Sequence, residues 1–433
     1  MWRKIKRALR IAGPGIITGA ADDDPSGIAT YSQTGARFGY SQLWAMLLMV
    51  PMMIALQEMC ARIGIVKGMG IAGVARANYH KSVLYTAVGL MLIANMINLG
   101  ADIGAMAAAA RLIVPLPFFV LAIVFAVLSL GLQITFSYRV YSRYLKWLTI
   151  SLFAYVLTGF VVSQDWSEVL HATLVPHIEL TFGYLMILVG VLGTTISPYL
   201  FFWQASEEVE EEEERGGLPP VERLPRAGPL PSVSPTDIRN MRIDTWSGMI
   251  FSQIAAWFII ITAAGSLHKA GMTNIATAAD AAKALEPLVH SFPSAGKIAE
   301  IIFAVGIVGL GLLAIPTLAG AASYGLAETF GWKVGLFRKP ADAPQFYVIL
   351  AVAMLGGMAI DFAGIDPIKA LIFSAIINGV VAVPLILLVI LIANNREIMG
   401  KEYANGIWSN VIGWLTLAAM ALASIAMLVS LIR

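Results

Sequence analysis

Near its N-terminus the chain reads Ala21-Asp22-Asp23-Asp24-Pro25-Ser26-Gly27 inside an otherwise apolar segment. Charged groups within a bilayer-crossing segment are costly and usually functional. Pro25 removes a backbone donor and clashes with the preceding turn, and Gly27 weakens the helix further. We therefore expect a discontinuous helix whose free carbonyls and carboxylates face a cavity and suit a hard cation. The alternative is an end-of-helix cap on a short first span, which we favour less because residues 30–38 are too few for a second span.

The composition around this segment is that of an integral membrane protein. Of the 433 residues, 58% are hydrophobic and only 13% are charged, against about 45–50% and about 25% in soluble domains. The net charge of +2 does not suggest a nucleic-acid partner. Cys60 is the one cysteine, so an internal disulfide and a cysteine-based metal cage are excluded.

A bilayer-crossing helix needs about 20 mostly apolar residues. Eleven segments meet this requirement, which predicts an all-α protein with eleven transmembrane helices near 11–33, 42–66, 83–109, 116–137, 145–164, 181–205, 245–265, 298–323, 345–362, 366–394 and 408–432.

The basic residues set the expected orientation. With the N-terminus in the cytoplasm, 22 of the 29 Lys and Arg residues fall on the cytoplasmic side, as the positive-inside rule requires. The C-terminus then lies outside, and we expect a cell (inner or plasma) membrane. Residues 206–243, with the acidic run Glu210–Glu214, are predicted to form a solvated cytoplasmic loop, and residues 266–297 an outer loop with a Thr-capped helix from Thr277 to His290.

A second interruption matches the first. The sixth predicted span reads Gly193-Thr194-Thr195-Ile196-Ser197-Pro198-Tyr199, and Pro198 follows Pro25 by 173 residues. Each proline opens a block of about five spans, and paired interruptions of this kind indicate an inverted-repeat transporter with its site between the breaks. This predicts one repeat over residues 1–170, a second over 171–400, and an eleventh span within 401–433.

Other intramembrane polar residues are few. Asp102 follows Asn95 and Asn98 in the third span, and it could be a second ligand, a proton carrier or part of an intraprotein pair, the last being somewhat favoured. Asn378 in the tenth span could bind an ion or a neighbouring helix. Asp361 and Asp366 flank the turn between the ninth and tenth spans, where we expect them to cap helices.

Several motifs together resemble the Nramp family of divalent-metal transporters. The first span, with Gly13-Pro14-Gly15 and Asp24-Pro25-Ser26-Gly27, is similar to the family segment that carries Asp-Pro-Gly-Asn. The end of the second span (61–68), the sixth-span segment 194–199 and Val383-Pro384-Leu385 are also similar to family segments. The resemblance covers most of the chain and implies a LeuT-type fold with broken first and sixth helices.

The resemblance also shows where this chain departs from the family. The metal-binding Asp matches Asp24 and a backbone-carbonyl ligand matches Thr194, but the family's Asn, Met and His correspond to Gly27, Ser197 and Tyr199. Of the acidic third-span positions that carry protons in the family, one aligns with Leu99 and another with Asp102. The chain therefore resembles most the divergent Nramp-related branch, some members of which carry magnesium.

The chemistry of these exchanges favours Mg²⁺ as cargo, with Mn²⁺ as a possible second. A thioether prefers Mn, Fe and softer ions, and Ser197 offers a hydroxyl instead. Mg²⁺ keeps several waters, so a roomier oxygen-lined site suits it. The expected metal residues are Asp24, Asp23, Gly27, Thr194, Ser197, Tyr199 and Asn378, supported by Asp22 and Asp102 as second-shell or proton-path groups.

These observations predict a transporter that works by alternating access without obligatory proton coupling. Its expected partners are the divalent ion and the lipid bilayer, with no resident cofactor, nucleic acid or obligate protein partner. The competing interpretations are a proton-coupled Mn²⁺/Fe²⁺ transporter and an organic-solute carrier of the same fold. An enzyme is the least expected, because the sequence has no nucleophile–base pair, Cys/His cluster or phosphate-binding loop.

Overall fold

The computed structural model describes residues 13–136, 151–214, 228–230, 233–362 and 364–432, which form helices and loops with no strand among them. The longer helices are α3 (Pro25–Phe38), α4 (Leu43–Lys67), α6 (Lys81–Ala110), α7 (Phe118–Thr135), α11 (Phe182–Thr195), α12 (Pro198–Glu214), α13 (Pro235–Ala263), α16 (Ala295–Phe330), α17 (Pro344–Asp361), α18 (Pro367–Asn394) and α20 (Ile407–Ile432). The shorter ones are α2 (Pro14–Asp22), α5 (Ile71–Asn78), α9 (Leu152–Val161), α10 (Trp166–Leu174), α14 (Ala278–Ala282), α15 (Glu286–Val289), α19 (Arg396–Met399), the π-helical η3 (Ala264–His268) and the 3₁₀ turn η4 (Lys283–Leu285).

Nine helical segments of the described chain are long and apolar enough to cross a membrane, with α11 and α12 together forming one of them. The first predicted span, 11–33, corresponds to α2 and α3, each of which is too short to count alone. The fifth, 145–164, falls partly outside the described residues, which retain only α9. The all-helical membrane architecture is therefore confirmed, while the count of eleven helices and the inverted repeat stay predictions.

Both predicted helix breaks are present. α2 ends at Asp22 and α3 begins at Pro25, so two residues separate the half-helices. α11 ends at Thr195 and α12 begins at Pro198. A proline occupies the first position of both second halves, where its missing N–H leaves no hydrogen bond unmade.

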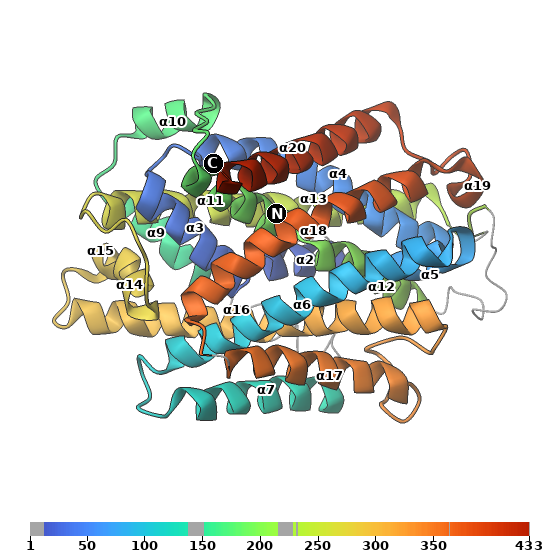
Figure 1. Cartoon of the computed structure of the whole chain (residues 1–433), viewed down its shortest axis with the longest axis horizontal. Helices are drawn as coiled ribbons and strands as arrows, with labels where there is room; N and C mark the ends of the chain where they lie inside the picture. The colour runs from blue at the N-terminus through green and yellow to red at the C-terminus, as the bar shows by residue number, and fades with distance from the viewer. Residues whose placement is uncertain (1–12, 137–150, 215–227, 231–232, 363, 433) are drawn as a thin grey trace, which may run out of the picture.

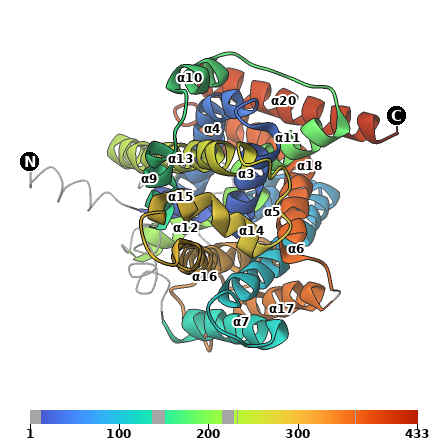
Figure 2. The ribbon, with the colours of Figure 1, turned by 90° about the vertical axis from the view of Figure 1, so that its left-hand side faces the viewer.

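The broken helices lie against the central helices of the bundle. α6 packs on α16, α17 and α18, and α13 packs on α2, α3 and α4. Figure 1 shows these long helices running between two opposite ends of the molecule, with α10, α14 and α15 at one end and α5 and α19 at the other, and Figure 2 views the molecule from the end that carries α10, α14 and α15. The connections predicted to be outside and inside therefore lie at opposite ends.

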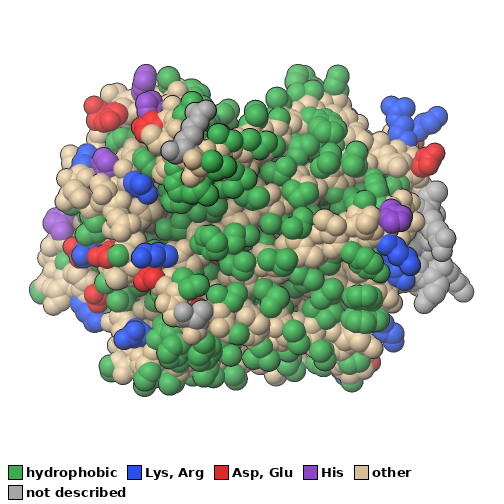
Figure 3. Space-filling model, in the orientation of Figure 1, with side chains coloured by type: hydrophobic (Ala, Val, Ile, Leu, Met, Phe, Trp, Pro, Cys, Tyr) green, Lys and Arg blue, Asp and Glu red, His purple; other side chains and the backbone are tan. Residues whose placement is uncertain are grey.

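The surface agrees with a membrane setting. Figure 3 shows hydrophobic side chains covering the middle of the molecule, whereas charged side chains and histidines gather at its two ends. A surface of this kind buries its apolar band in lipid and leaves both charged ends in water.

Two loop predictions need correction. The acidic run Glu210–Glu214 belongs to helix α12, and the buried Glu210 carboxylate accepts hydrogen bonds from the Tyr324 hydroxyl and the Leu336 N–H. These partners hold the run in a helix, so the prediction of a solvated loop is wrong there. Helix α13 also begins at Pro235, inside the predicted loop 206–243, because Ser234 and Asp237 form a capping box.

The outer loop 266–297 follows its prediction more closely. Thr277 caps α14 through a capping box with Asp280, as the sequence indicates. The expected single helix is instead three short pieces, α14, η4 and α15. Asp366 caps α18, but Asp361 is the last residue of α17 and caps no helix start, so that part of the prediction is wrong.

Candidate functional site

Asp24 is the N-cap residue of α3, and its side chain binds the first turn of this helix. Its Oδ1 atom accepts the Gly27 N–H at 2.7 Å and the Ser26 hydroxyl at 2.6 Å. An acceptor at the N-cap satisfies donors that the helix itself leaves free, and its negative charge suits the positive end of the helix. The sequence Asp24-Pro25-Ser26-Gly27 therefore both starts the second half-helix and fixes the Asp24 carboxylate at the break.

The other oxygen of Asp24 faces two neighbouring helices. Asn98 Nδ2 of α6 lies 3.0 Å from Asp24 Oδ2, and the Tyr199 hydroxyl of α12 lies 3.4 Å from the same atom. The Tyr199 hydroxyl is also 3.3 Å from the carbonyl oxygen of Ala21 in α2. One carboxylate thus joins both broken helices to α6.

The break in the sixth span lies directly beside the first. The hydroxyls of Ser26 and Thr194 are 3.3 Å apart. Ser197 turns its hydroxyl back on α11, where it donates to the carbonyl oxygens of Gly193 at 2.8 Å and Thr194 at 2.7 Å. In this conformation the Ser197 hydroxyl occupies one of the two lone pairs of the Thr194 carbonyl oxygen.

Helix α18 closes the same cluster from a third direction. Asn378 Nδ2 lies 3.4 Å from Asn98 Oδ1, and Asn98 Nδ2 lies 3.4 Å from Asp102 Oδ2. Among the described residues, Asn378 Oδ1 and Asp102 Oδ1 are buried without a hydrogen-bond partner. Asn378 therefore contacts a neighbouring helix and also keeps a free oxygen, so both of its predicted roles fit the geometry.

Asn98 is a site residue that the sequence does not single out. It contacts Asp24, Asp102 and Asn378 and so stands at the centre of the cluster. The sequence contains one indication of this role. Asn98 precedes Asp102 by four residues, and residues four apart lie on the same face of a helix.

The two remaining aspartates lie apart from these contacts. Asp22 Oδ2 accepts the Ser252 hydroxyl of α13 at 2.6 Å, and neither oxygen of Asp23 has a hydrogen-bond partner among the described residues. In the described part of the chain no three carboxylate, imidazole or thiol groups converge on one point. The hydrogen bonds around Asp24 therefore come from neutral groups, and Asp23 takes no part in them.

The comparison with known families supports the resemblance drawn from these motifs. The profile of the Nramp family, described as natural resistance-associated macrophage protein-like, matches residues 15–430. The chain belongs to the Nramp family.

Nramp relatives match over nearly the whole chain. The divalent metal cation transporter MntH of Deinococcus radiodurans is 26% identical over 428 residues, which cover 95% of this chain and 88% of the relative. MntH of Klebsiella pneumoniae is 27% identical over 434 residues, covering 96% and 92%. These relatives are membrane transporters, which confirms the prediction that the chain is not an enzyme.

Solved structures share the fold of this Nramp protein. A manganese transporter of Eremococcus coleocola, in complex with an aromatic bis-isothiourea compound, has a TM-score of 0.73 at 18% identity, covering 97% of this chain and 86% of the other. Mhp1, a nucleobase-cation-symport-1 family transporter, has a TM-score of 0.59 at 12% identity, covering 97% and 90%. These likenesses support the LeuT-type fold.

The cluster in this Nramp protein is closed on all sides. Asp24, Thr194, Ser197 and Asn378 are each about 1% exposed. Toward α5 and α19, Thr18 of α2 lies 2.5 Å from Gln204 of α12. This buried hydrogen bond joins the first half of the first span to the second half of the sixth span.

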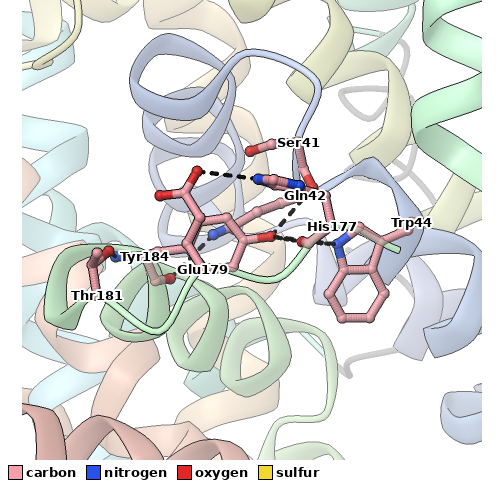
Figure 4. A network of polar contacts seen from close by, with 7 residues as sticks. All are labelled: Ser41, Gln42, Trp44, His177, Glu179, Thr181 and Tyr184. Atoms are coloured by element: carbon pink, nitrogen blue, oxygen red, sulfur yellow. Dashed lines mark hydrogen bonds and ion pairs between the residues drawn. The ribbon is translucent and has the colours of Figure 1, made fainter. Parts of the chain in front are cut away.

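Toward the opposite end, a polar network links the turn between α3 and α4 to the segment that leads into α11 (Figure 4). Trp44 Nε1 donates to the carbonyl oxygen of His177 at 2.9 Å, and the Tyr184 hydroxyl contacts that same oxygen and the Ser41 carbonyl oxygen. Gln42 Nε2 donates to the Tyr184 carbonyl oxygen at 3.1 Å. The start of α11 is thereby held to the turn between α3 and α4.

Proposed function

We propose that this chain transports divalent metal cations across a membrane, with Mg²⁺ as its principal cargo and Mn²⁺ as a second one. The proposal follows from family membership, from the names of the curated relatives as divalent metal cation transporters, and from the oxygen-rich cluster at the paired breaks. Nitrogen, sulfur and oxygen ligands select different metals, so the donor set is the main guide to the cargo.

The observation that carries the choice of Mg²⁺ is the set of groups around Asp24. Every described hydrogen-bond partner of its carboxylate is a hydroxyl, an amide or a backbone N–H. At the position where the family resemblance implies a thioether, Ser197 has a hydroxyl. One carboxylate with neutral oxygens suits a hard cation that keeps part of its water shell.

Two small residues lie at the breaks, and the chain packs closely around one of them in the described conformation. Gly27 has no side chain, and a Cβ atom at this position would lie 3.4 Å from the Thr194 hydroxyl and 3.3 Å from the Asp22 carbonyl oxygen. A larger side chain such as asparagine would therefore be crowded between the two breaks, and any space for water there has to come from opening of the site. We propose that Gly27 and Ser197 together leave this space for waters of the Mg²⁺ ion.

We propose alternating access as the mechanism. The first and sixth spans would rock with their neighbours against the third, fourth, eighth and ninth spans. In the described conformation Asp24 is buried, so the path between these two groups of helices is closed at both ends. Opening one of them at a time would expose Asp24 to one side of the membrane. The N-terminus would face the cytoplasm and the C-terminus the outside.

A proton-coupled Mn²⁺/Fe²⁺ transporter is the second candidate. It is favoured by the continuous line of hydrogen bonds from Asp24 through Asn98 to Asp102, which offers a carboxyl group beside the proposed metal site. An organic-solute carrier of the same fold is favoured less, because three aspartates at one break suit a cation better than a substrate carboxylate.

Flux measurements with purified protein in proteoliposomes test these candidates. We expect saturable Mg²⁺ uptake, weaker Mn²⁺ uptake, and no acidification of the lumen as either ion enters, when an indicator dye reports internal pH. Protein-free liposomes and an Asp24→Asn variant serve as controls. Strong Mn²⁺-driven acidification without any Mg²⁺ flux would contradict both the cargo and the uncoupled mechanism.

A further inference from the structure

Asp23 occupies an unusual position for a carboxylate. Its side chain is fully buried, and neither of its oxygens has a hydrogen-bond partner among the described residues. Asp24, one residue later, uses both of its oxygens. A buried carboxylate without a partner is costly in free energy. Asp23 therefore needs a bound proton or a bound cation to balance its charge.

Asp22 adds a second carboxylate with little support of its own. It is fully buried, its Oδ2 accepts the Ser252 hydroxyl, and its Oδ1 is unpartnered in the described part of the chain. None of the ion pairs between described residues includes Asp22 or Asp23. Three of the four carboxylate oxygens of this pair thus lack a hydrogen-bond partner, and no Lys or Arg of the described ranges forms an ion pair with either group.

The backbone at this point also favours a cation. α2 ends at Asp22, so the last carbonyl groups of this half-helix have no further N–H partners within it. The C-terminal end of a helix carries partial negative charge. In transporters with broken helices, such ends and the unwound carbonyls beside them bind Na⁺.

The charge of the segment indicates which cation would complete it. Ionised Asp22, Asp23 and Asp24 together carry three negative charges, and a divalent ion at Asp24 neutralises two of them. One monovalent ion at the other two aspartates leaves the buried segment neutral. This step rests on the proposed function, because it takes a divalent ion as the occupant of the Asp24 cluster.

The pair of aspartates lies close to the crossing of α2 and α13. One turn before the pair, α2 and α13 touch so closely that a Cβ atom on Gly19 would lie 2.3 Å from the Gly248 carbonyl oxygen. Gly248 lies one turn before Ser252 on α13, so the pair stands beside a tight helix crossing. We propose that Asp22, Asp23 and Ser252 bind one Na⁺ ion, at a second cation site separate from the divalent site.

Thermal unfolding of the detergent-purified full-length protein tests this site. The unfolding temperature is measured in NaCl, KCl and choline chloride at equal ionic strength, with EDTA and no added divalent ion. We expect Na⁺ to raise the unfolding temperature in a saturable way, because an ion that binds only to the folded state stabilises that state by mass action. Since no divalent ion is present, a failure of Mg²⁺ transport would leave this readout unchanged.

Substitutions test whether the Na⁺ effect on unfolding temperature comes from Asp22 and Asp23. For Asp23→Asn, the NaCl concentration that gives half of the rise in unfolding temperature should be at least about tenfold higher than for the wild type. The substitution removes one of the two carboxylates that would bind the ion. Asp361→Asn removes another buried carboxylate with an unpartnered oxygen and should keep the wild-type dependence. If Asp23→Asn does not fold, Ser252→Ala should still weaken the Na⁺ response. Equal unfolding temperatures of the wild type in NaCl and KCl would overturn the proposal, as would an unchanged NaCl response in Asp23→Asn.

Discussion

Asp244 Oδ2 lies 2.6 Å from the backbone nitrogen of Gly15, so a carboxylate of α13 accepts a hydrogen bond from the first turn of α2. Its other oxygen accepts the Gly13 N–H at 2.8 Å. The N–H groups at a helix start have no partners within the helix, and an external carboxylate satisfies them as an N-cap side chain would. Asp244 therefore ties α2, the first half of the first span, to α13.

Replacing Asp244 should loosen this connection. We expect Asp244→Ala to lower the free energy of unfolding by about 1–2 kcal/mol, the usual cost of removing such a cap. Asp244→Asn keeps an acceptor oxygen and should lose less. Thermal unfolding of both variants in detergent, beside the wild type, gives the comparison. An Ala variant as stable as the wild type would show that the two hydrogen bonds contribute nothing to the closed state.

The charge of Asp24 can be separated from its capping role. Asp24→Asn keeps an oxygen that can accept the Gly27 N–H, so α3 should still begin at Pro25. Its negative charge is lost, and we therefore expect saturable Mg²⁺ uptake into proteoliposomes to fall below detection while expression and unfolding temperature stay close to wild type. Uptake at the wild-type rate would remove Asp24 from the transport site.

The sequence predicts the two helix breaks well because their causes are local. Pro25 and Pro198 each stand beside several small polar residues, and the structure starts a new half-helix at each. By contrast, Pro51, Pro316 and Pro384 lie inside helices that continue, so proline alone does not cause the breaks. The role of Asn98 depends instead on which face of α6 meets the breaks, and the sequence of one helix does not contain that. Asp23 illustrates the same limit, because its neighbour Asp24 has the same chemistry but turns toward different helices.

The acidic run Glu210–Glu214 shows a different limit. Five successive glutamates are typical of a solvated segment, yet α12 extends through them because Tyr324 and Leu336 from distant parts of the chain bind Glu210. A partner more than 100 residues away leaves no trace in local composition. Long-range contacts of this kind determine how far a helix continues beyond its apolar residues.

Close packing between α11 and α18 gives a steric prediction. A Cβ atom on Gly193 would lie 2.1 Å from the Ala375 carbonyl oxygen and 2.2 Å from the Gly379 backbone nitrogen. Since both are backbone atoms, we expect Gly193→Ala to push the helices apart and to cost about 1–3 kcal/mol of unfolding free energy. Mg²⁺ uptake should fall as well, because Gly193 directly precedes Thr194.

The matched control is Gly89→Ala in α6. A Cβ atom there meets nothing within 4 Å, so alanine should leave stability unchanged or raise it by about 0.5–1 kcal/mol, as expected for Gly to Ala in a helix. Unfolding temperatures of the two variants give the contrast. Equal effects of the two substitutions would mean that α11 and α18 are not packed as closely as described.

Selectivity should depend on the atom at position 197. Ser197→Met places a thioether beside the breaks, and a thioether favours softer ions over Mg²⁺. The hydroxyl bonds of Ser197 to the Gly193 and Thr194 carbonyl oxygens are lost at the same time, which frees the Thr194 carbonyl to face an ion. We therefore expect the ratio of Mn²⁺ or Cd²⁺ uptake to Mg²⁺ uptake to rise about tenfold or more, a difference of about 1.4 kcal/mol.

Competition assays in proteoliposomes measure this ratio, with Cd²⁺ added at increasing concentration against a fixed amount of Mg²⁺. Ser247→Met is the control, because Ser247 is exposed on α13 and its hydroxyl contacts only its own helix at the Ile243 carbonyl oxygen. This control should keep the wild-type selectivity. If Ser197→Met transports normally but also keeps that selectivity, the side chain at position 197 does not face the ion, and the Mg²⁺ preference must come from Gly27 and the neutral groups around Asp24.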